Sequence, residues 1–159
     1  MAIEIERKFL VKGDTWRSLG TGQVYRQGYI TTVNSTTVRI RIVGDRGYLT
    51  IKGKTDGIAR SEFEYLIPVE DAQSMLDTLC DRPLIEKIRY KIQFGNLLWE
   101  VDEFLGENQG LIMAEVELDD ANRTIELPDW IAKEVSSDRK YYNSNLAKYP
   151  YQQWKDFEK

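Results

Sequence analysis

Pairs of like-charged residues two positions apart recur along this sequence. The acidic pairs are Glu4/Glu6, Glu62/Glu64, Glu100/Asp102 and Glu115/Glu117, and the basic pairs are Arg39/Arg41, Lys52/Lys54 and Lys87/Arg89. Side chains two positions apart on a β-strand point to the same side, so each pair would project into one space. Paired carboxylates bind hard cations, and arginine in particular suits phosphate oxygens. The pattern therefore predicts a site for metal ions and a polyanion.

The residue types that are missing narrow the chemistry further. The chain of 159 residues has no histidine and a single cysteine, Cys80. These absences exclude Ser-His-Asp and Cys-His catalysis, and they exclude a zinc site built from imidazole and thiolate ligands. Any metal must be held by carboxylate oxygens, which favours Mg²⁺, Mn²⁺ or Ca²⁺.

The segments that carry these pairs alternate between apolar and charged residues, which is the period of a β-strand. We expect strands over residues 3–11, 23–32, 38–42, 48–54, 60–69, 87–92, 97–102 and 114–118. We expect helices over residues 70–80, 130–135, 143–147 and 151–157. Short connections between strands favour an antiparallel sheet, and closure removes exposed edges. The predicted fold is mainly β: a closed eight-stranded antiparallel barrel with a few peripheral helices.

Either face of these strands could line the barrel. The ordinary arrangement puts the apolar face inside and leaves the charged face in water. A solvated face normally mixes the two signs, however, whereas here each strand carries mostly one sign. The inverted arrangement is also self-consistent, because metal ions and a polyanion would partner the enclosed charges. We favour a charged interior, with the apolar face outward and partly covered by helices.

Length and composition limit the number of domains, the partners and the compartment that the protein can have. Residues 1–159 suit a single domain, with 42% hydrophobic and 30% charged residues. The net charge of −4 argues against bulk nucleic-acid binding. No apolar run approaches a membrane span, and the start of the sequence lacks a signal-peptide pattern. With one cysteine, a reducing compartment fits best, so we expect a cytoplasmic protein with no membrane or nucleic-acid partner.

The segment Glu4-Ile5-Glu6-Arg7-Lys8 resembles the E-x-E-x-K signature of the CYTH superfamily, the triphosphate tunnel metalloenzymes. The resemblance continues in family order through residues 39–41, 50–52, 62–64, 87–90, 100–102, 115–117 and 142–147, so it covers essentially the whole chain. It implies a triphosphate held by divalent metal ions inside a barrel.

The resemblance also implies roles for individual residues. The metal ligands would be Glu4, Glu6, Glu64, Asp102, Glu115 and Glu117, and the phosphate ligands Lys8, Arg39, Arg41, Lys52, Lys87, Arg89 and one or both of Arg139 and Lys140. Lys8 would lie near the reacting phosphoryl group. Tyr29 would be catalytic by orienting water, or would tune specificity, or else would be a packed aromatic residue. The family usually has one basic residue near Asp138; this chain has two, which leaves open which one faces the tunnel. Lys54 and Arg60 would lie at the tunnel mouth or be solvated.

The implied activity is metal-dependent hydrolysis of inorganic tripolyphosphate to pyrophosphate and orthophosphate, with nucleoside triphosphates as poorer substrates. Two Mg²⁺ or Mn²⁺ ions would serve each active site, with Ca²⁺ as an inhibitor. An adenylate cyclase and a thiamine triphosphatase would use the same triphosphate cage. A polyphosphate or nucleotide sensor is the alternative without catalysis, and the many carboxylates argue against it. The resemblance fits either a monomer or a homodimer.

Overall fold

The computed structural model describes residues 3–159, apart from the side chain of Phe157. Its strands are β1 (Ile3–Val11), β2 (Gly22–Ile30), β3 (Thr37–Val43), β4 (Arg46–Lys52), β5 (Ala59–Ile67), β6 (Ile85–Phe94), β7 (Leu97–Phe104), β8 (Ile112–Glu117) and β9 (Ile131–Glu134). Its α-helices are α1 (Val69–Thr78) and α2 (Asn143–Leu146). The eight strands expected from the sequence are therefore all present.

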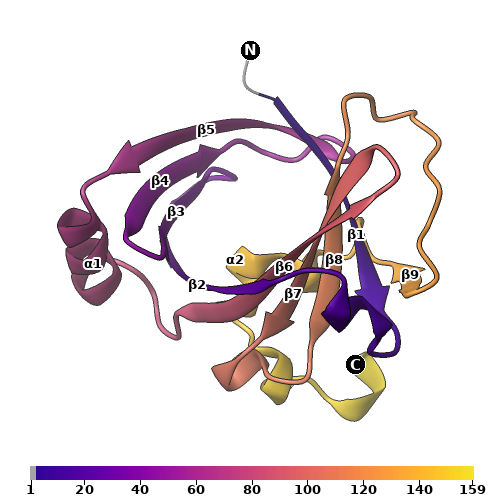
Figure 1. Ribbon diagram of the computed structural model, residues 1–159. Coiled ribbons are helices and arrows are strands. Elements are labelled where there is room, and N and C mark those ends of the chain that lie inside the picture. Colours follow the sequence, from indigo (N-terminus) through magenta and orange to yellow (C-terminus); the bar gives the residue numbers. More distant parts are fainter. Residues whose placement is uncertain (1–2) are drawn as a thin grey trace.

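The first eight strands close into an antiparallel barrel, in which the order is β5-β4-β3-β2-β6-β7-β8-β1 and β1 returns to β5 (Figure 1). The closing pairing is short: Ile3, Glu4 and Ile5 face Ser61, Arg60 and Ala59. The rest of β1 pairs with β8, from Glu6 opposite Glu117 to Leu10 opposite Met113. One strand thus joins both ends of the sheet, which confirms the predicted closed barrel.

The segment 130–135, which we expected to be helical, is strand β9. It pairs with β1 outside the barrel, with a register shift between Phe9 and Val11. Ile131 and Trp130 are buried there in the outer apolar core. A local helical pattern was overridden by pairing with a distant strand edge. The expected helix over residues 151–157 is instead two 3₁₀ turns, Tyr151–Gln153 and Asp156–Glu158.

The apolar side chains of β1, β6, β7 and β8 point outward and form the main core. Phe9, Trp99, Val101 and Val116 are at most 1% exposed, and β9 and the 3₁₀ turn Thr15–Ser18 pack against this side. Helix α1 instead contacts β3 and β4, where Leu76 packs on Ile40 and Ile42. The core therefore lies outside the barrel wall, as the inverted arrangement requires.

The C-terminal segment closes part of one barrel end. Leu146 and Ala147, together with Tyr141 and Trp154, pack against apolar side chains of β6 to β8 such as Phe104. Helix α2 lies across the barrel opening in Figure 1. None of the helices in the described part of the chain is long and apolar enough to cross a membrane.

Candidate functional site

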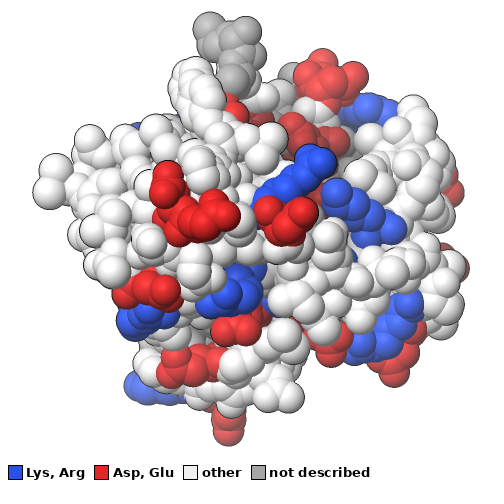
Figure 2. Space-filling model, turned by 60° about the vertical axis from the view of Figure 1, so that its left-hand side comes forward, with Lys and Arg blue, Asp and Glu red and all other residues white. Residues whose placement is uncertain are grey.

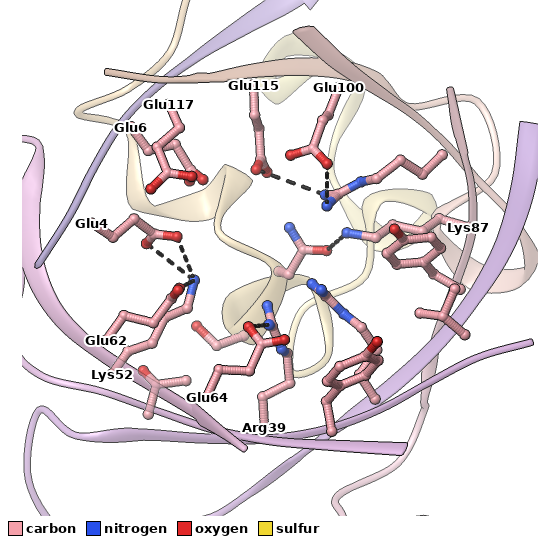
Figure 3. Close-up of a pocket in the computed structure, with 18 of the residues that line it drawn as sticks. Glu4, Glu6, Arg39, Lys52, Glu62, Glu64, Lys87, Glu100, Glu115 and Glu117 are labelled. Atoms are coloured by element: carbon pink, nitrogen blue, oxygen red, sulfur yellow. Dashed lines mark hydrogen bonds and ion pairs between the residues drawn. The ribbon is translucent and has the colours of Figure 1, made fainter. Parts of the chain in front are cut away.

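A cavity of about 460 Å³ occupies the barrel interior. Its wall is sorted by charge around the strand order, as Figure 3 shows. Most of the carboxylates come from the consecutive strands β7, β8, β1 and β5, which we call the acidic arc: Glu100, Glu115, Glu117, Glu4, Glu6, Glu62 and Glu64. Asp45, in the turn between β3 and β4, also lines the cavity. The cations come mainly from β4, β3 and β6, which with β2 we call the basic arc: Lys52, Arg39, Arg41, Lys87, Arg89 and Lys91. Seven of the eight barrel strands thus supply charge to the cavity wall, and β2 supplies neutral groups.

The acidic arc sets carboxylates directly opposite one another. Glu6 faces Glu117 across β1 and β8, and Glu100 faces Glu115 across β7 and β8. Like charges in directly opposed positions destabilise a sheet. Burial, together with the charges of Glu115 and Glu4, raises the pKa of Glu6 to about 7. The acidic arc therefore holds more negative charge than its surroundings compensate.

Lys8 is a cation inside the acidic arc. Its Nζ lies 2.8 Å from Glu115 Oε1 and 3.0 Å from Glu6 Oε1. Burial opposes the charged ammonium, but the carboxylates of Glu115 and Glu6 outweigh it and raise the pKa of Lys8 above its ordinary value. Lys8 is therefore a permanent cation at the point where the carboxylates crowd most.

The basic arc has an excess of positive charge. Burial and the neighbouring guanidinium groups of Arg39 and Arg89 lower the pKa of Arg41 to about 10. Burial is also the main cause that lowers the pKa of Lys87 to about 7, even though Asp102 lies beside it. A group whose charged form is disfavoured in this way would gain from an incoming anion.

Neutral side chains of β2 separate the cations of the basic arc. The Tyr25 ring lies between two guanidinium groups, with the Cζ atoms of Arg41 and Arg89 each 5.0 Å from the ring centre. Gln27 Oε1 accepts a hydrogen bond from Arg41 Nε at 3.2 Å, and Gln27 Nε2 donates to Tyr29 Oη at 2.8 Å. This row of neutral groups holds the arginines apart and orients them toward the cavity.

At one boundary between the arcs, Asp102 lies between Lys87 and Arg89. Its two oxygens accept hydrogen bonds of 2.7 and 2.8 Å from Arg89, and Lys87 Nζ lies 2.8 Å from Oδ2. Asp102 is 1% exposed and does not line the cavity. The cations of Arg89 and Lys87 outweigh the effect of burial and lower its pKa. This position suits a fixed counter-ion and does not support the metal-ligand role expected from the resemblance.

At the other boundary, Lys52 and Arg39 meet carboxylates of the acidic arc. Lys52 Nζ lies 3.1 Å from Glu4 Oε1 and 3.3 Å from Glu62 Oε2. Arg39 is 4.0 Å from Glu64, and its Nη2 donates to Thr50 Oγ1 at 3.2 Å. The Nε of Arg39 is buried with no hydrogen-bond partner. A buried N–H group without a partner is unfavourable, so an anion brought within hydrogen-bond distance of this group would be stabilised.

The donor chemistry of the acidic arc fits a hard cation, since every candidate ligand is a carboxylate oxygen. Within residues 3–159, however, no group of three or more Cys, Asp or Glu side chains converges closely enough to enclose an ion. Instead, Lys8 and Lys52 form ion pairs with carboxylates of this wall. The ligand types fit a divalent metal, and closing around one would require side-chain rotation.

The structure also places the remaining residues expected from the sequence. Tyr29 lines the cavity and is 6% exposed. Arg139 lines a neighbouring hollow. Lys140 lies outside both: its Nζ donates to the carbonyl oxygen of Glu158 and stacks 4.9 Å from the Trp154 ring centre. That position does not support Lys140 as a phosphate ligand. The direction of the Lys140 side chain is determined by packing of the C-terminal residues, which the local sequence does not reveal.

Two neutral residues that contact the cations of the cavity were not expected from the sequence: Gln27, which is buried behind the wall, and Asn143, which lines the cavity. Gln27 connects Arg41 to Tyr29, and Asn143 Oδ1 accepts a hydrogen bond from Lys87 at 2.9 Å. Neither belongs to a like-charged pair, so the pattern of charge pairs does not indicate them. The alternation of β2 was the available signal, because Gln27 occupies the same face as Tyr25 and Tyr29.

Comparison with known proteins places this geometry among relatives. The model of the CYTH domain matches residues 2–149. An inorganic triphosphatase of Acetivibrio thermocellus is 54% identical over 156 residues, which cover 98% of this chain and all of that protein. An inorganic triphosphatase of Nitrosomonas europaea is 36% identical, covering 91% of this chain and 96% of that one. A crystal structure of an inorganic triphosphatase superposes with a TM-score of 0.63 at 33% identity, covering 92% of this chain and 95% of that one.

Proposed function

The chain belongs to the CYTH family, and from this premise we propose that it hydrolyses inorganic tripolyphosphate to pyrophosphate and orthophosphate. The observation that carries the proposal is the sorting of charge around one cavity, where an acidic arc faces a basic arc. A phosphate chain together with metal ions satisfies both arcs at once. Two inorganic triphosphatases that align over nearly the whole chain support the same substrate.

In this proposal the basic arc binds the phosphate chain. Arg39, Arg41 and Arg89 offer planar donor groups to the oxygens, and Lys52 and Lys87 add charge. Water attacks the terminal phosphorus, the bond to the bridging oxygen breaks, and the departing pyrophosphate keeps the bonding electrons. Fixed cations next to the developing negative charge supply most of the rate enhancement, because phosphoryl transfer depends on positioning and electrostatics.

Carboxylates of the acidic arc would hold a divalent ion: Glu4, Glu6, Glu115 and Glu117, with Glu64 as a further candidate. Such an ion, Mg²⁺ or Mn²⁺, supplies Lewis acidity and charge neutralisation at the phosphate oxygens. Two ions per site and inhibition by Ca²⁺ are finer parts of the same proposal. Lys8, held between Glu6 and Glu115, is placed to contact the reacting phosphoryl group. Tyr29, hydrogen-bonded to Gln27, is a candidate to orient the attacking water.

The cytoplasmic compartment also stays a proposal, supported by the single cysteine.

The test is an assay of the purified protein with tripolyphosphate, ATP and thiamine triphosphate, each with Mg²⁺ or Mn²⁺. Orthophosphate, pyrophosphate, cyclic AMP and thiamine diphosphate are measured as products. We expect tripolyphosphate to give the highest kcat/KM and to yield equal amounts of orthophosphate and pyrophosphate. Cyclic AMP as the main product from ATP would contradict hydrolysis, and turnover of none of the three would contradict an enzyme. No described feature of the cavity favours the cyclase or the thiamine enzyme, since its lining is polar or charged almost throughout.

A further inference from the structure

A second hollow of about 360 Å³ adjoins the catalytic cavity. It is bordered by the connection between β2 and β3, by residues 53–55 after β4, and by the C-terminal segment from Arg139 to Lys148. The two hollows share the side chains of Tyr29, Thr37, Arg60, Tyr142 and Ser144. They therefore meet beside Tyr29, at the inner edge of the basic arc.

The charge of this second hollow is almost entirely positive. Its cations are Lys54, Arg60, Arg139 and Lys148, whereas its acidic group is Asp81. Asp81 Oδ2 already accepts a hydrogen bond of 2.6 Å from Thr31 Oγ1. Within residues 3–159, the side-chain nitrogens of Lys54, Arg139 and Lys148 form no ion pair or hydrogen bond with another side chain. Arg60 is paired with Glu4 at 3.4 Å, so the uncompensated positive charge of the hollow comes from Lys54, Arg139 and Lys148. This charge lies next to a cavity proposed to bind a phosphate chain.

The neutral lining adds hydrogen-bond donors, and apolar side chains such as Ile30 and Val38 form a smaller part of it. Hydroxyl groups come from Ser35, Thr37, Thr55, Ser144 and others of the lining. The aromatic residues, Tyr29 and Tyr142, lie where the two hollows meet. A site for a nucleobase or another flat organic group would need apolar or aromatic walls. Cations and hydroxyl groups in a concave site instead match the oxygens of a phosphate group.

We propose that this second hollow is a phosphate-binding site outside the catalytic cavity, with Lys54 and Lys148 among its ligands. Two sources share the required chemistry: a free orthophosphate ion, and the additional phosphate units of a linear chain longer than three. Because the two hollows meet at Tyr29 and Arg60, either a free orthophosphate ion or the end of a longer chain could reach the second hollow. Which of these two ligands binds depends on the proposed function, whereas the ability of the second hollow to bind a phosphate group does not.

The test uses the full chain with Lys54→Gln and Lys148→Gln combined. Both side chains are exposed, so folding should be preserved and can be checked by thermal melting. The matched control combines Lys12→Gln and Lys133→Gln, which remove two exposed cations that line none of the cavities. Two readouts are made on each protein: kinetics with tripolyphosphate and a defined longer polyphosphate, with and without orthophosphate, and acetylation of individual lysines by acetic anhydride, read by mass spectrometry.

For a longer chain as the source, the double variant should lose about fivefold in kcat/KM on the longer polyphosphate relative to tripolyphosphate, which is about 1 kcal/mol. For free orthophosphate as the source, the variant should instead lose noncompetitive inhibition by orthophosphate. The control should do neither. Equal behaviour of the two variants in both kinetic comparisons would overturn the proposal.

Acetylation tests binding without relying on catalysis. In the wild-type protein, orthophosphate or the longer polyphosphate should slow acetylation of Lys54 and Lys148 but leave Lys12 and Lys133 unchanged. This result would stand even if the protein hydrolysed no tripolyphosphate, in which case only the proposed function would fail. Absence of protection with both anions would overturn the second site, whatever the enzyme activity.

Discussion

The acidic arc and the basic arc use the same strand geometry, but they differ in how their charges are compensated. The acidic arc contains its own cation, since Lys8 lies between Glu6 and Glu115. Within residues 3–159, no carboxylate on β4, β3, β2 or β6 lines the cavity, although Asp45 of the turn between β3 and β4 does. The cations of the basic arc are separated by the neutral Tyr25 and Gln27 of β2. A small cation can replace or join Lys8 on one wall, whereas the other wall requires an anion long enough to span several strands.

The outer surface is less organised than the cavity. Figure 2 shows groups of both signs separated by wide uncharged areas on the face that carries α1. Several apolar side chains of β4 and β5 are exposed there, including Phe63 at 45% and Tyr65 at 56%. Strict sorting of charge is therefore a property of the barrel interior, which links it to ligand binding and not to solubility.

The largest expected effect comes from removing a carboxylate of the acidic arc. Glu6→Gln should lower kcat/KM with tripolyphosphate and Mg²⁺ by about 10³-fold, the usual loss when one electrostatic contact to a transition state is removed. Thermal stability of the metal-free variant should not fall, because Glu6 is repelled by Glu117 and Glu115. Glu86→Gln, an exposed carboxylate on the outside of β6, is the matched control. Wild-type activity in Glu6→Gln would contradict its assignment as a metal ligand.

Substitution of Asp102, at the boundary between the two arcs, should mainly lower the stability of the fold. Asp102→Asn leaves Lys87 and Arg89 buried without their shared carboxylate, so the free energy of unfolding should fall by about 3 kcal/mol. Urea denaturation measures this change. Glu103→Gln, on the same strand, removes only a partly exposed pair with Arg17 and should cost less than about 1 kcal/mol. Equal effects of the two substitutions would show that Asp102 is not the counter-ion of the basic arc.

A cation of the basic arc should affect binding without affecting the fold. Arg41→Gln should raise KM for tripolyphosphate by about 100-fold, as expected for losing a charged contact of about 3 kcal/mol. Stability should hold, because Arg41 forms no ion pair with the residues that the structure describes and is repelled by Arg39 and Arg89. Arg26→Gln, on the same side of the barrel but outside the cavity, provides the control. A stable variant with unchanged KM would remove Arg41 from the binding surface.

The spacing role of Tyr25 predicts a smaller effect. Tyr25→Leu should raise KM about tenfold by releasing the two guanidinium groups from the ring, while Tyr25→Phe should keep near wild-type kinetics. Steady-state kinetics on both variants decides the point. An equal loss in Phe and Leu would assign the effect to the hydroxyl group and not to the ring between the arginines.

The pH dependence of stability should reveal the excess charge of the acidic arc. Because the pKa of Glu6 is raised from 4.5 to about 7, the folded protein binds a proton more tightly than the unfolded chain. The stability this contributes is complete below pH 4.5 and is lost as pH rises through about 7. Without metal, wild-type stability should therefore fall more steeply between pH 5 and pH 8 than that of Glu6→Gln. Parallel curves would show that Glu6 titrates normally.

The sequence was most informative about features that depend on neighbouring residues. Period-two alternation located all eight barrel strands and showed which residues of a strand share a face, because side-chain direction on a strand is a local property. The pairing of β2 with β6 and the closure of β1 on β5 join residues far apart in the chain. No local pattern distinguishes these partners.

The roles within like-charged pairs were less predictable for the same reason. Glu100 and Asp102 form an identical pattern in the sequence, but Glu100 faces the cavity whereas Asp102 is enclosed by Lys87 and Arg89. The difference comes from depth in the barrel, where Asp102 lies nearer the apolar end that holds Phe104. The expected helix over residues 130–135 was wrong for a similar reason, since pairing with the distant strand β1 determines β9. The choice between Arg139 and Lys140, which the sequence left open, also depends on distant packing.

Each arc carries uncompensated charge that a ligand of opposite sign would neutralise. Thermal melting of the wild-type protein, Glu6→Gln and Arg41→Gln, each with Mg²⁺ alone or with tripolyphosphate in a chelator, tests it directly. Both additions should stabilise the wild-type protein. Glu6→Gln should lose most of the Mg²⁺ effect and keep that of tripolyphosphate, and Arg41→Gln should do the reverse. If neither ligand stabilises the wild-type protein, or if each variant loses both effects equally, the two-arc account is wrong.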